Sequence, residues 1–461
     1  MTTEKAHISA AIDELATVLG DRLSTSQAVR DHHGADLTYH GKMPPDAVAF
    51  VKSEAEVAAI MRICARHNTP VIPFGAGTSL EGHFLAAHGG VCIDLTQMDQ
   101  ILRVSREDMD VTVQPGVTRE KLNEYLRDTG LFFPIDPGAN ATIGGMASTR
   151  ASGTNAVRYG TMRENVLNLS VVLADGRIIK TARRARKSSA GYDLTRLFVG
   201  AEGTLGVITG ITLRLYGIPD VISSAVCPFD SLEGAVNAVI LTIQSGAPIA
   251  RIELLNATQM KAINNFSNLG CAEQPTLFLE FHGSEASVAE QVDQVRTIAS
   301  DFGGGDFQWA TRTEDRNKLW QARHNAAFAI VAMRPGAAFL PTDVCVPISR
   351  LADCILETED DLASEGVLAP IVGHVGDGNF HVTLSFDRDD EEEVAKVKRL
   401  NERLVQRALA MEGTCTGEHG VGLGKMDFLV AEHGEALSVM RAVKQALDPA
   451  NIMNPGKIIR V

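Results

Sequence analysis

The sequence predicts an α+β protein with two domains, and three observations lead to that fold class. Short apolar strands alternate with amphipathic helical segments along the chain. Glycine contributes 41 of the 461 residues, which indicates many tight turns between these elements. The chain is longer than one ordinary domain, and Pro219 follows a strand-rich region. We therefore expect a first domain over 1–219, a second domain with a mixed sheet over 220–445, and a C-terminal tail over 446–461.

The first domain is expected to begin with two strands on either side of a helix. Apolar residues at helical spacing predict a helix over 54–67 with one buried face. The second of these strands leads into a glycine-rich loop at 75–82. From 111 to 215 strands dominate, and the dipeptide Asp175-Gly176 between two of them predicts a hairpin turn.

The second domain alternates strands with longer amphipathic helices, which is the pattern of an α+β layer. Helices are expected near 231–245, 285–301, 314–333, 349–365 and 390–411. Strands are expected near 250–255, 276–282, 340–347, 370–375 and 380–386.

Composition excludes several classes of function. The formal net charge of −14 argues against nucleic acid or an anionic membrane surface as the main partner. No apolar run approaches the length of a membrane-spanning helix. The seven cysteines are scattered, without haem, iron–sulfur or metal-knuckle spacing, and no targeting segment is recognisable. We therefore expect reduced thiols and a cytoplasmic protein with no second redox centre.

The loop at 75–82 does not match the dinucleotide-binding fingerprint of a Rossmann fold. Gly75 and Gly77 are present, but Leu80 occupies the third glycine position and no helix of sufficient length follows. A strand that runs into Gly-Ala-Gly-Thr-Ser nevertheless exposes successive backbone N–H groups, and such turns bind phosphate. Two later segments rich in Gly, Ser, Thr and Asn suit a long ligand held by backbone amides; a plain loop is the alternative for each.

Two histidines flank a predicted hairpin turn at Asp377-Gly378. A two-residue turn there would place His374 directly opposite His381, on one face of the sheet. Together with Glu418, the two imidazoles would form a three-ligand set for a divalent metal with open positions. The alternative is a pair of polar residues on a sheet face.

Six segments resemble the FAD-linked oxidases of the vanillyl-alcohol oxidase and p-cresol methylhydroxylase type. They are PFGAGTSLEGH at 73–83, GTNAVRYG at 153–160, GAEGTLG at 200–206, NPGK at 454–457, HVGDGNFH at 374–381 and GTCTGEHG at 413–420. Within that family they are most similar to the D-2-hydroxy-acid dehydrogenases of the cytochrome-type D-lactate dehydrogenase group. The resemblance implies an FAD-binding domain of two α+β subdomains, completed by the C-terminal tail, and an α+β substrate (cap) domain.

The resemblance also implies the residues that bind non-covalent FAD. They are Gly75, Ala76, Gly77, Thr78, Ser79, Gly82, Pro137, Gly138, Thr142, Gly144, Gly145, Ser152, Gly153, Asn155, Tyr159, Gly160, Glu202, Gly203, Gly206, Ile208 and Asn454.

The resemblance assigns the metal to His374, His381 and Glu418, and affinity order alone does not choose between zinc and manganese. It assigns the general base to His419 and the group that binds the substrate carboxylate to Arg323. Ala327 and Pro341 stand where 2-hydroxyglutarate-specific relatives bind a second carboxylate, which favours a small monocarboxylic acid.

The implied reaction is oxidation of a D-2-hydroxy acid, lactate-like, to the 2-oxo acid, with metal-assisted deprotonation and hydride transfer to flavin N5. The electrons would pass to a separate cytochrome, quinone or electron-transfer flavoprotein, through which the enzyme could lie peripheral to a membrane. A homodimer is compatible with the sequence. The alternatives are D-2-hydroxyglutarate or glycolate oxidation, an ether-lipid synthase on the same scaffold, and a metal-dependent hydrolase that activates water.

Overall fold

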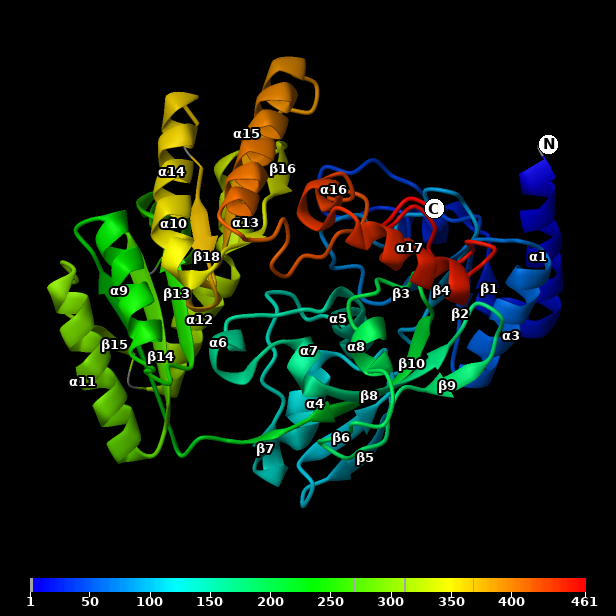
Figure 1. The fold of residues 1–461 in the computed structure, drawn as a ribbon, viewed down its shortest axis with the longest axis horizontal. Coiled ribbons are helices and arrows are strands. Elements are labelled where there is room, and N and C mark those ends of the chain that lie inside the picture. The colour runs from blue at the N-terminus through cyan, green and yellow to red at the C-terminus, as the bar shows by residue number, and fades with distance from the viewer. Residues whose placement is uncertain (1–2, 269, 311, 368) are drawn as a thin grey trace. The chain divides into compact units, whose positions relative to one another are not determined.

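The computed structural model describes residues 3–268, 270–310, 312–367 and 369–461, which form two compact units (Figure 1). The first unit comprises the chain up to Ser152, Thr161–Gly217 and Glu418–Val461, and the second comprises Gly153–Gly160 and Ile218–Gly417. This division assigns 153–160 and 418–445 differently from the ranges expected from the sequence. No helix among the described residues is both long and apolar enough to cross a membrane.

The first unit contains two main sheets. One has the order β1-β2-β4-β3, formed by Leu23–Ser24, Ala47–Phe50, Val91–Asp94 and Val71–Phe74, and its last three strands are parallel. The other is antiparallel with the order β5-β6-β10-β8-β9, formed by Ile101–Ser105, Asp110–Val113, Val207–Arg214, Val166–Val172 and Ile178–Lys180. A two-stranded sheet joins β7 (Leu131–Phe132) to β11 (Tyr216–Gly217).

Several helices of the first unit begin at a residue whose side chain caps them. Ser53 accepts a hydrogen bond from the Glu56 amide and starts α3, Glu54–Arg66, whose buried residues lie at the predicted spacing. The remaining α-helices of this unit are α1 (Thr3–Leu19), α2 (Gln27–His32), α4 (Arg119–Leu126), α5 (Ile143–Thr149), α7 (Met162–Asn165), α8 (Leu194–Phe198), α16 (Phe428–His433) and α17 (Ala436–Leu447).

The end of the chain extends the parallel sheet. Val71 forms a parallel bridge with Met453. The Val71 amide donates to the Ile452 carbonyl, and the Val71 carbonyl accepts from the Asn454 amide. Ile452 and Met453 belong to the same buried cluster as Val71 and the core face of α3. Lys444 of α17 donates to the Met453 carbonyl at 2.8 Å and thereby holds the tail against its own helix.

The second unit is built on an antiparallel sheet with the order β15-β12-β14-β13-β18-β19-β16, and β17 also pairs with β19. In that order the strands are Gln308–Ala310, Val221–Pro228, Thr276–Gly283, Arg251–Leu255, Ile371–Gly373, Asn379–Phe386 and Ala338–Pro341, with β17 at Val344–Cys345. The α+β class is confirmed. The expectation of a mixed sheet was wrong, because every pairing between described strands of this unit is antiparallel.

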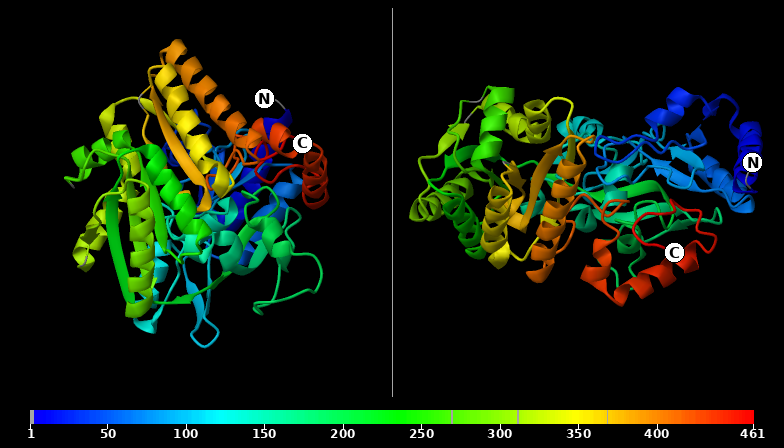
Figure 2. Two further views of the ribbon diagram at one scale, coloured as in Figure 1. Left: turned by 60° about the vertical axis from the view of Figure 1, so that its left-hand side comes forward. Right: turned by 90° about the horizontal axis from the view of Figure 1, so that it is seen from above.

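Helices pack beside this sheet. α9 (Leu232–Gln244) and α11 (Glu285–Asp301) lie side by side, and so do α14 (Leu351–Ser364) and α15 (Glu391–Ala410), as Figures 1 and 2 show. The helix expected over 314–333 is divided at Asn325 into α12 (Thr313–His324) and α13 (Ala326–Met333). The other helices are α6 (Ala156–Tyr159) and α10 (Ala257–Ser267).

The predicted hairpin at 374–381 has a different register. The expected partner of His381 was His374, but the structure pairs His381 with Val372. A short 3₁₀ turn at Val375–Asp377 lengthens the connection between the two strands. Gly378, at φ +79°, ends that turn. The shift is two residues, so it preserves the face to which each side chain points.

Candidate active site

The loop after β3 presents a row of backbone amides. Within the described part of the chain, none of the amides of residues 75–80 donates a hydrogen bond. Gly77 and Gly82 adopt φ values of +66° and +71°, which glycine accepts without steric cost. Amides presented by such a turn form an anion-binding concavity, so the loop fits the pyrophosphate of a dinucleotide cofactor.

A second coil segment lies against this loop. A Cβ at Gly75 would come within 2.3 Å of Thr142 Oγ1, and one at Gly144 within 2.5 Å of Pro115. Thr142 also caps α5, accepting a hydrogen bond from the Gly145 amide at 3.4 Å. Pro137 and Gly138 are more exposed, and a Cβ at Gly138 would meet nothing within 4 Å. The two segments therefore form a narrow cradle that admits little more than backbone.

Glu202 and Asn454 are two of the residues expected to contact the cofactor. In the structure their side chains bond to other loops of the chain. The Glu202 carboxylate accepts hydrogen bonds from the amides of Val421 and Gly422 at 2.7 and 2.8 Å. The Asn454 amide group donates to the carbonyls of Glu202 and His83. Both side chains thus fix the loops around the cradle. The neighbouring Gly203, Gly206 and Ile208 lie at the start of β10 or just before it.

Segment 153–160 lies in the second unit, although the sequence places it in the first domain. Arg251 donates to Asn155 Oδ1 at 2.9 Å, and the Tyr159 hydroxyl lies 2.8 Å from His282 Nδ1. His282 in turn contacts Glu280 at 2.9 Å, with its other ring nitrogen. These contacts anchor the segment to β13 and β14, while Ser152 just before it remains buried in the first unit.

The structure brings His374 and His381 together. Their ring centroids are 5.7 Å apart, and both side chains are buried. His374 Nδ1 lies 2.8 Å from Glu253 Oε1, and His381 Nδ1 lies 3.1 Å from the Thr342 carbonyl oxygen. Both contacts are to oxygen acceptors, so each histidine donates from Nδ1, and in the neutral imidazole the lone pair then lies on Nε2. Second-layer contacts of this kind orient metal-binding histidines, so the pair fits a divalent ion.

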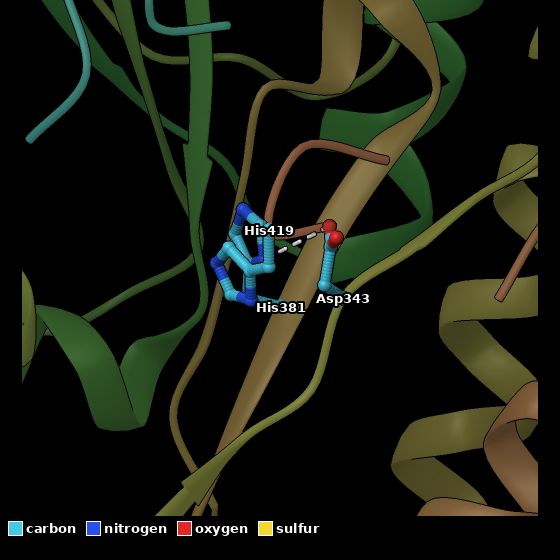
Figure 3. Close-up of side chains that lie close together, drawn as sticks. All are labelled: Asp343, His381 and His419. Carbon is cyan, nitrogen blue, oxygen red and sulfur yellow. Dashed lines mark ion pairs between the residues drawn. The ribbon is translucent and has the colours of Figure 1, made fainter. Parts of the chain in front are cut away.

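Glu418 is the residue after Gly417, where the chain leaves the second unit. One oxygen of its carboxylate lies within 4.8 Å of a ring nitrogen of both histidines. Asp343, His381 and His419 form a second such group, drawn in Figure 3. In that group both Asp343 oxygens already accept hydrogen bonds, from Asn379 and Thr416. The carboxylate of this second group is thus already held by two donors of the chain.

His419 faces a buried carboxylate that the sequence did not indicate. Its Nδ1 lies 3.8 Å from Glu81 Oε1, and the Lys425 ammonium lies 3.2 Å from the same oxygen. Burial opposes ionisation of Glu81, but Lys425 and His419 outweigh it and hold the pKa of Glu81 below its ordinary value. The arrangement places an acidic side chain beside the His419 ring.

Arg323 is buried and paired with Glu253. Its Nε and Nη2 atoms donate to Glu253 Oε2 at 3.0 and 2.5 Å. Burial raises the pKa of Glu253, yet His374 and Arg323 together bring that pKa below the usual value. Nη1 lies on the other edge of the guanidinium, where it can donate to a substrate carboxylate.

Sequence reasoning missed Glu253, Asp343 and Glu81. Glu253 carried a usable signal, because a carboxylate inside the apolar strand 251–255 requires a buried partner. Asp343 and Glu81 lie in segments without such periodicity, and only the fold shows which side chains they approach.

Comparisons with known proteins agree with this geometry. Residues 218–458 match the C-terminal domain of the FAD-linked oxidases, and residues 45–182 match an FAD-binding domain. The chain is 54% identical over its full length to a probable mitochondrial D-lactate dehydrogenase of Danio rerio, covering 94% of that protein. It is 49% identical, over 97% of its length, to a mitochondrial D-lactate dehydrogenase [cytochrome] of Arabidopsis thaliana, covering 80% of that protein.

A solved structure of p-cresol methylhydroxylase shares the fold, with a TM-score of 0.80 at 16% identity, covering 99% of this chain and 98% of that one.

The expectation of a cytoplasmic location is contradicted by these relatives, because both have names that place them in mitochondria. All seven cysteines are free, as expected, but free thiols did not discriminate between these compartments. The match of the C-terminal domain spans more than half of the chain, and full-length relatives exceed 30% identity. With its amide-lined cradle and paired histidines, the chain belongs to the FAD-linked oxidases.

Proposed function

We propose that this protein is an FAD-dependent dehydrogenase that oxidises D-lactate, or a close D-2-hydroxy acid, to the 2-oxo acid. The full-length identity of 54% to a probable D-lactate dehydrogenase carries the proposal. A histidine pair poised for a hydroxy acid–binding metal supports it. The electrons then pass to a separate acceptor protein or quinone.

The amides of 75–80 hold the FAD pyrophosphate, with the coil around Thr142 closing the cradle. When bound, FAD supplies the two-electron acceptor for the hydride leaving the substrate. No residue of the loop's core is a covalent anchor, since His83 lies beyond it. Acid precipitation should therefore release all flavin, and flavin retained on the denatured chain would show a covalent bond.

His374, His381 and Glu418 hold one divalent ion, zinc or manganese. Such an ion supplies Lewis acidity, which lowers the pKa of a bound hydroxyl group. The ligand set carries one negative charge against two on the ion, which suits an anionic hydroxy acid.

His419 is the general base and Arg323 orients the substrate. The imidazole of His419 accepts the hydroxyl proton, and the Glu81 carboxylate, 3.8 Å from Nδ1, stabilises the positive charge that the ring then carries. Arg323 Nη1 donates to the substrate carboxylate, because its other edge is held by Glu253. A side chain with a second carboxylate would need another cation, and Ala327 and Pro341 supply none.

Anaerobic mixing of the purified protein with D- and L-lactate, glycolate and D-2-hydroxyglutarate tests the proposal. We expect the flavin absorbance band to bleach fastest with D-lactate and not with its L enantiomer. Faster bleaching by glycolate or D-2-hydroxyglutarate would reassign the substrate, and no bleaching by any of them would refute the dehydrogenase.

A further inference from the structure

One buried carboxylate connects two groups to which the proposed function gives different tasks. Glu253, on β13, is 1% exposed. Its Oε1 lies 2.8 Å from His374 Nδ1, and its Oε2 accepts both donors of the Arg323 guanidinium edge. The antiparallel register between β13 and β18 pairs Leu254 with Gly373. Glu253 precedes Leu254 and His374 follows Gly373, so these two residues lie opposite each other.

The pairing decides which ring nitrogen of His374 carries the proton. A carboxylate whose second oxygen already accepts from an arginine has only acceptor capacity toward the histidine. His374 must therefore donate from Nδ1, and in the neutral ring the lone pair is then on Nε2. A neutral imidazole can bind a metal only through the nitrogen without a proton.

We propose that Glu253 is a positioning residue, which fixes His374 in its metal-binding tautomer while it holds Arg323 in place for the substrate carboxylate. This inference rests on the proposed function for the roles of His374 and Arg323. It adds a link between them: a single side chain aligns the metal ligand and the substrate-binding cation, so a change at Glu253 disturbs both.

The variant Glu253→Gln tests this because an amide has only one oxygen. Arg323 has no acceptor atom, so the new Gln oxygen must face Arg323, and the amide NH₂ must face His374. Nδ1 of His374 then becomes an acceptor, and the proton moves to Nε2, the proposed metal-binding atom. We expect Zn²⁺ affinity, measured on FAD-loaded protein by competition with a chromophoric chelator, to fall about 10- to 100-fold.

The double variant Glu253→Gln with Arg323→Met provides the rescue. Without the guanidinium, the Gln oxygen can turn to His374 and accept from Nδ1 again, so most of the lost Zn²⁺ affinity should return. Glu280→Gln is the matched control: it is also a buried strand glutamate paired with an arginine and a histidine, Arg251 and His282. Its Zn²⁺ affinity should equal that of the wild type.

A second readout needs no metal. The ¹⁵N chemical shifts of His374 in the metal-free protein, assigned with a His374→Gln variant, report which nitrogen is protonated. They should show a proton on Nδ1 in the wild type and on Nε2 in Glu253→Gln. Unchanged tautomer and unchanged Zn²⁺ affinity in Glu253→Gln would overturn the inference. A wild type that binds no Zn²⁺ or Mn²⁺ would instead refute the metal in the proposed function, and the shifts would still decide the role of Glu253.

Discussion

The two units prepare their ligand-binding groups in opposite ways. In the first unit the cradle around Gly75 is made of backbone, and its amides are left without partners in the described chain. In the second unit His374, Arg323 and Glu253 are buried side chains whose polar atoms contact one another. A backbone cradle depends on the absence of side chains, whereas a side-chain cluster depends on the identity of each member and of the residues behind it. Substitutions should therefore act differently in the two units.

Removal of the metal should have the largest effect. Treatment with a chelator should abolish turnover while the flavin absorbance of the protein stays unchanged, because the cradle uses no metal ligand. Restored activity on adding back Zn²⁺ or Mn²⁺ provides the control. Elemental analysis should show that the treated protein contains no metal. Full activity of that metal-free protein would contradict the metal site of the second unit.

Replacement of the proposed base comes next. His419→Ala should lower the rate of flavin reduction about 10²- to 10⁴-fold, the usual contribution of a general base, with FAD and metal retained. Stopped-flow absorbance with saturating D-lactate measures it. Lys425→Met is a useful comparison, since it removes the other partner of Glu81 without touching the imidazole. A His419→Ala rate near that of the wild type would place the base elsewhere.

The cradle should respond to added volume and not to lost side chains. Gly75→Val puts methyl groups where a Cβ alone would lie 2.3 Å from Thr142 Oγ1. Overpacking costs about 1–3 kcal/mol, so FAD affinity should fall about 5- to 150-fold. Ser79→Ala keeps the same backbone amide and should bind FAD within about twofold of the wild type. Fluorescence titration of the apoprotein with FAD compares them; equal losses in both variants would count against a backbone cradle.

The smallest effect concerns stability and pH. Burial raises the pKa of Glu280, but Arg251, His282 and Ser224 outweigh burial and lower it to about 2, from an ordinary value of 4.5. A depressed carboxyl pKa stabilises the fold above about pH 4.5, and this stabilisation is lost as the pH falls toward 2. Glu280→Gln should cost about 1–3 kcal/mol in the free energy of unfolding at pH 7.

Urea unfolding of the wild type and Glu280→Gln should be measured at pH 7, 5, 4 and 3. The difference between their free energies of unfolding should become smaller below about pH 4.5. A difference in free energy of unfolding that stays constant over this range would mean that the charge of Glu280 does not contribute to stability.

The sequence pattern predicted that His374 and His381 lie close together, and this holds although the predicted strand register was wrong. Side chains alternate with a period of two along a strand, so a shift of two residues left His374 and His381 on the same face. The length of the turn was misjudged because Asp377-Gly378 closes a longer connection than the two-residue hairpin that this dipeptide favours.

Strand direction could not be obtained from the order of the elements. Alternating strands and helices favour parallel crossovers. Here, however, β12 and β13 are separated by β14, which is antiparallel to both. The insertion of one strand between two others is a long-range pairing, and local periodicity holds no information about it.

Side-chain roles in the glycine-rich segments were the least predictable. Glu202 and Asn454 stand in segments that resemble cofactor loops, yet their polar atoms bind other parts of the chain. Clustering of Gly, Thr and Asn shows where the backbone comes close to a ligand. It does not show which neighbouring side chains point inward and which ones brace the loops.

The pairing of Val71 with Met453 has a consequence for biosynthesis. Residues 218–417 form a continuous stretch, so the bulk of the second unit can assemble while the ribosome is still translating the remainder. The sheet that carries the 75–82 loop acquires its outermost pairing only after residues 452–454 have emerged, some 380 positions later by number. Such distant contacts form slowly. A nascent chain arrested before this segment would expose the edge of β3 that Met453 covers in the folded protein.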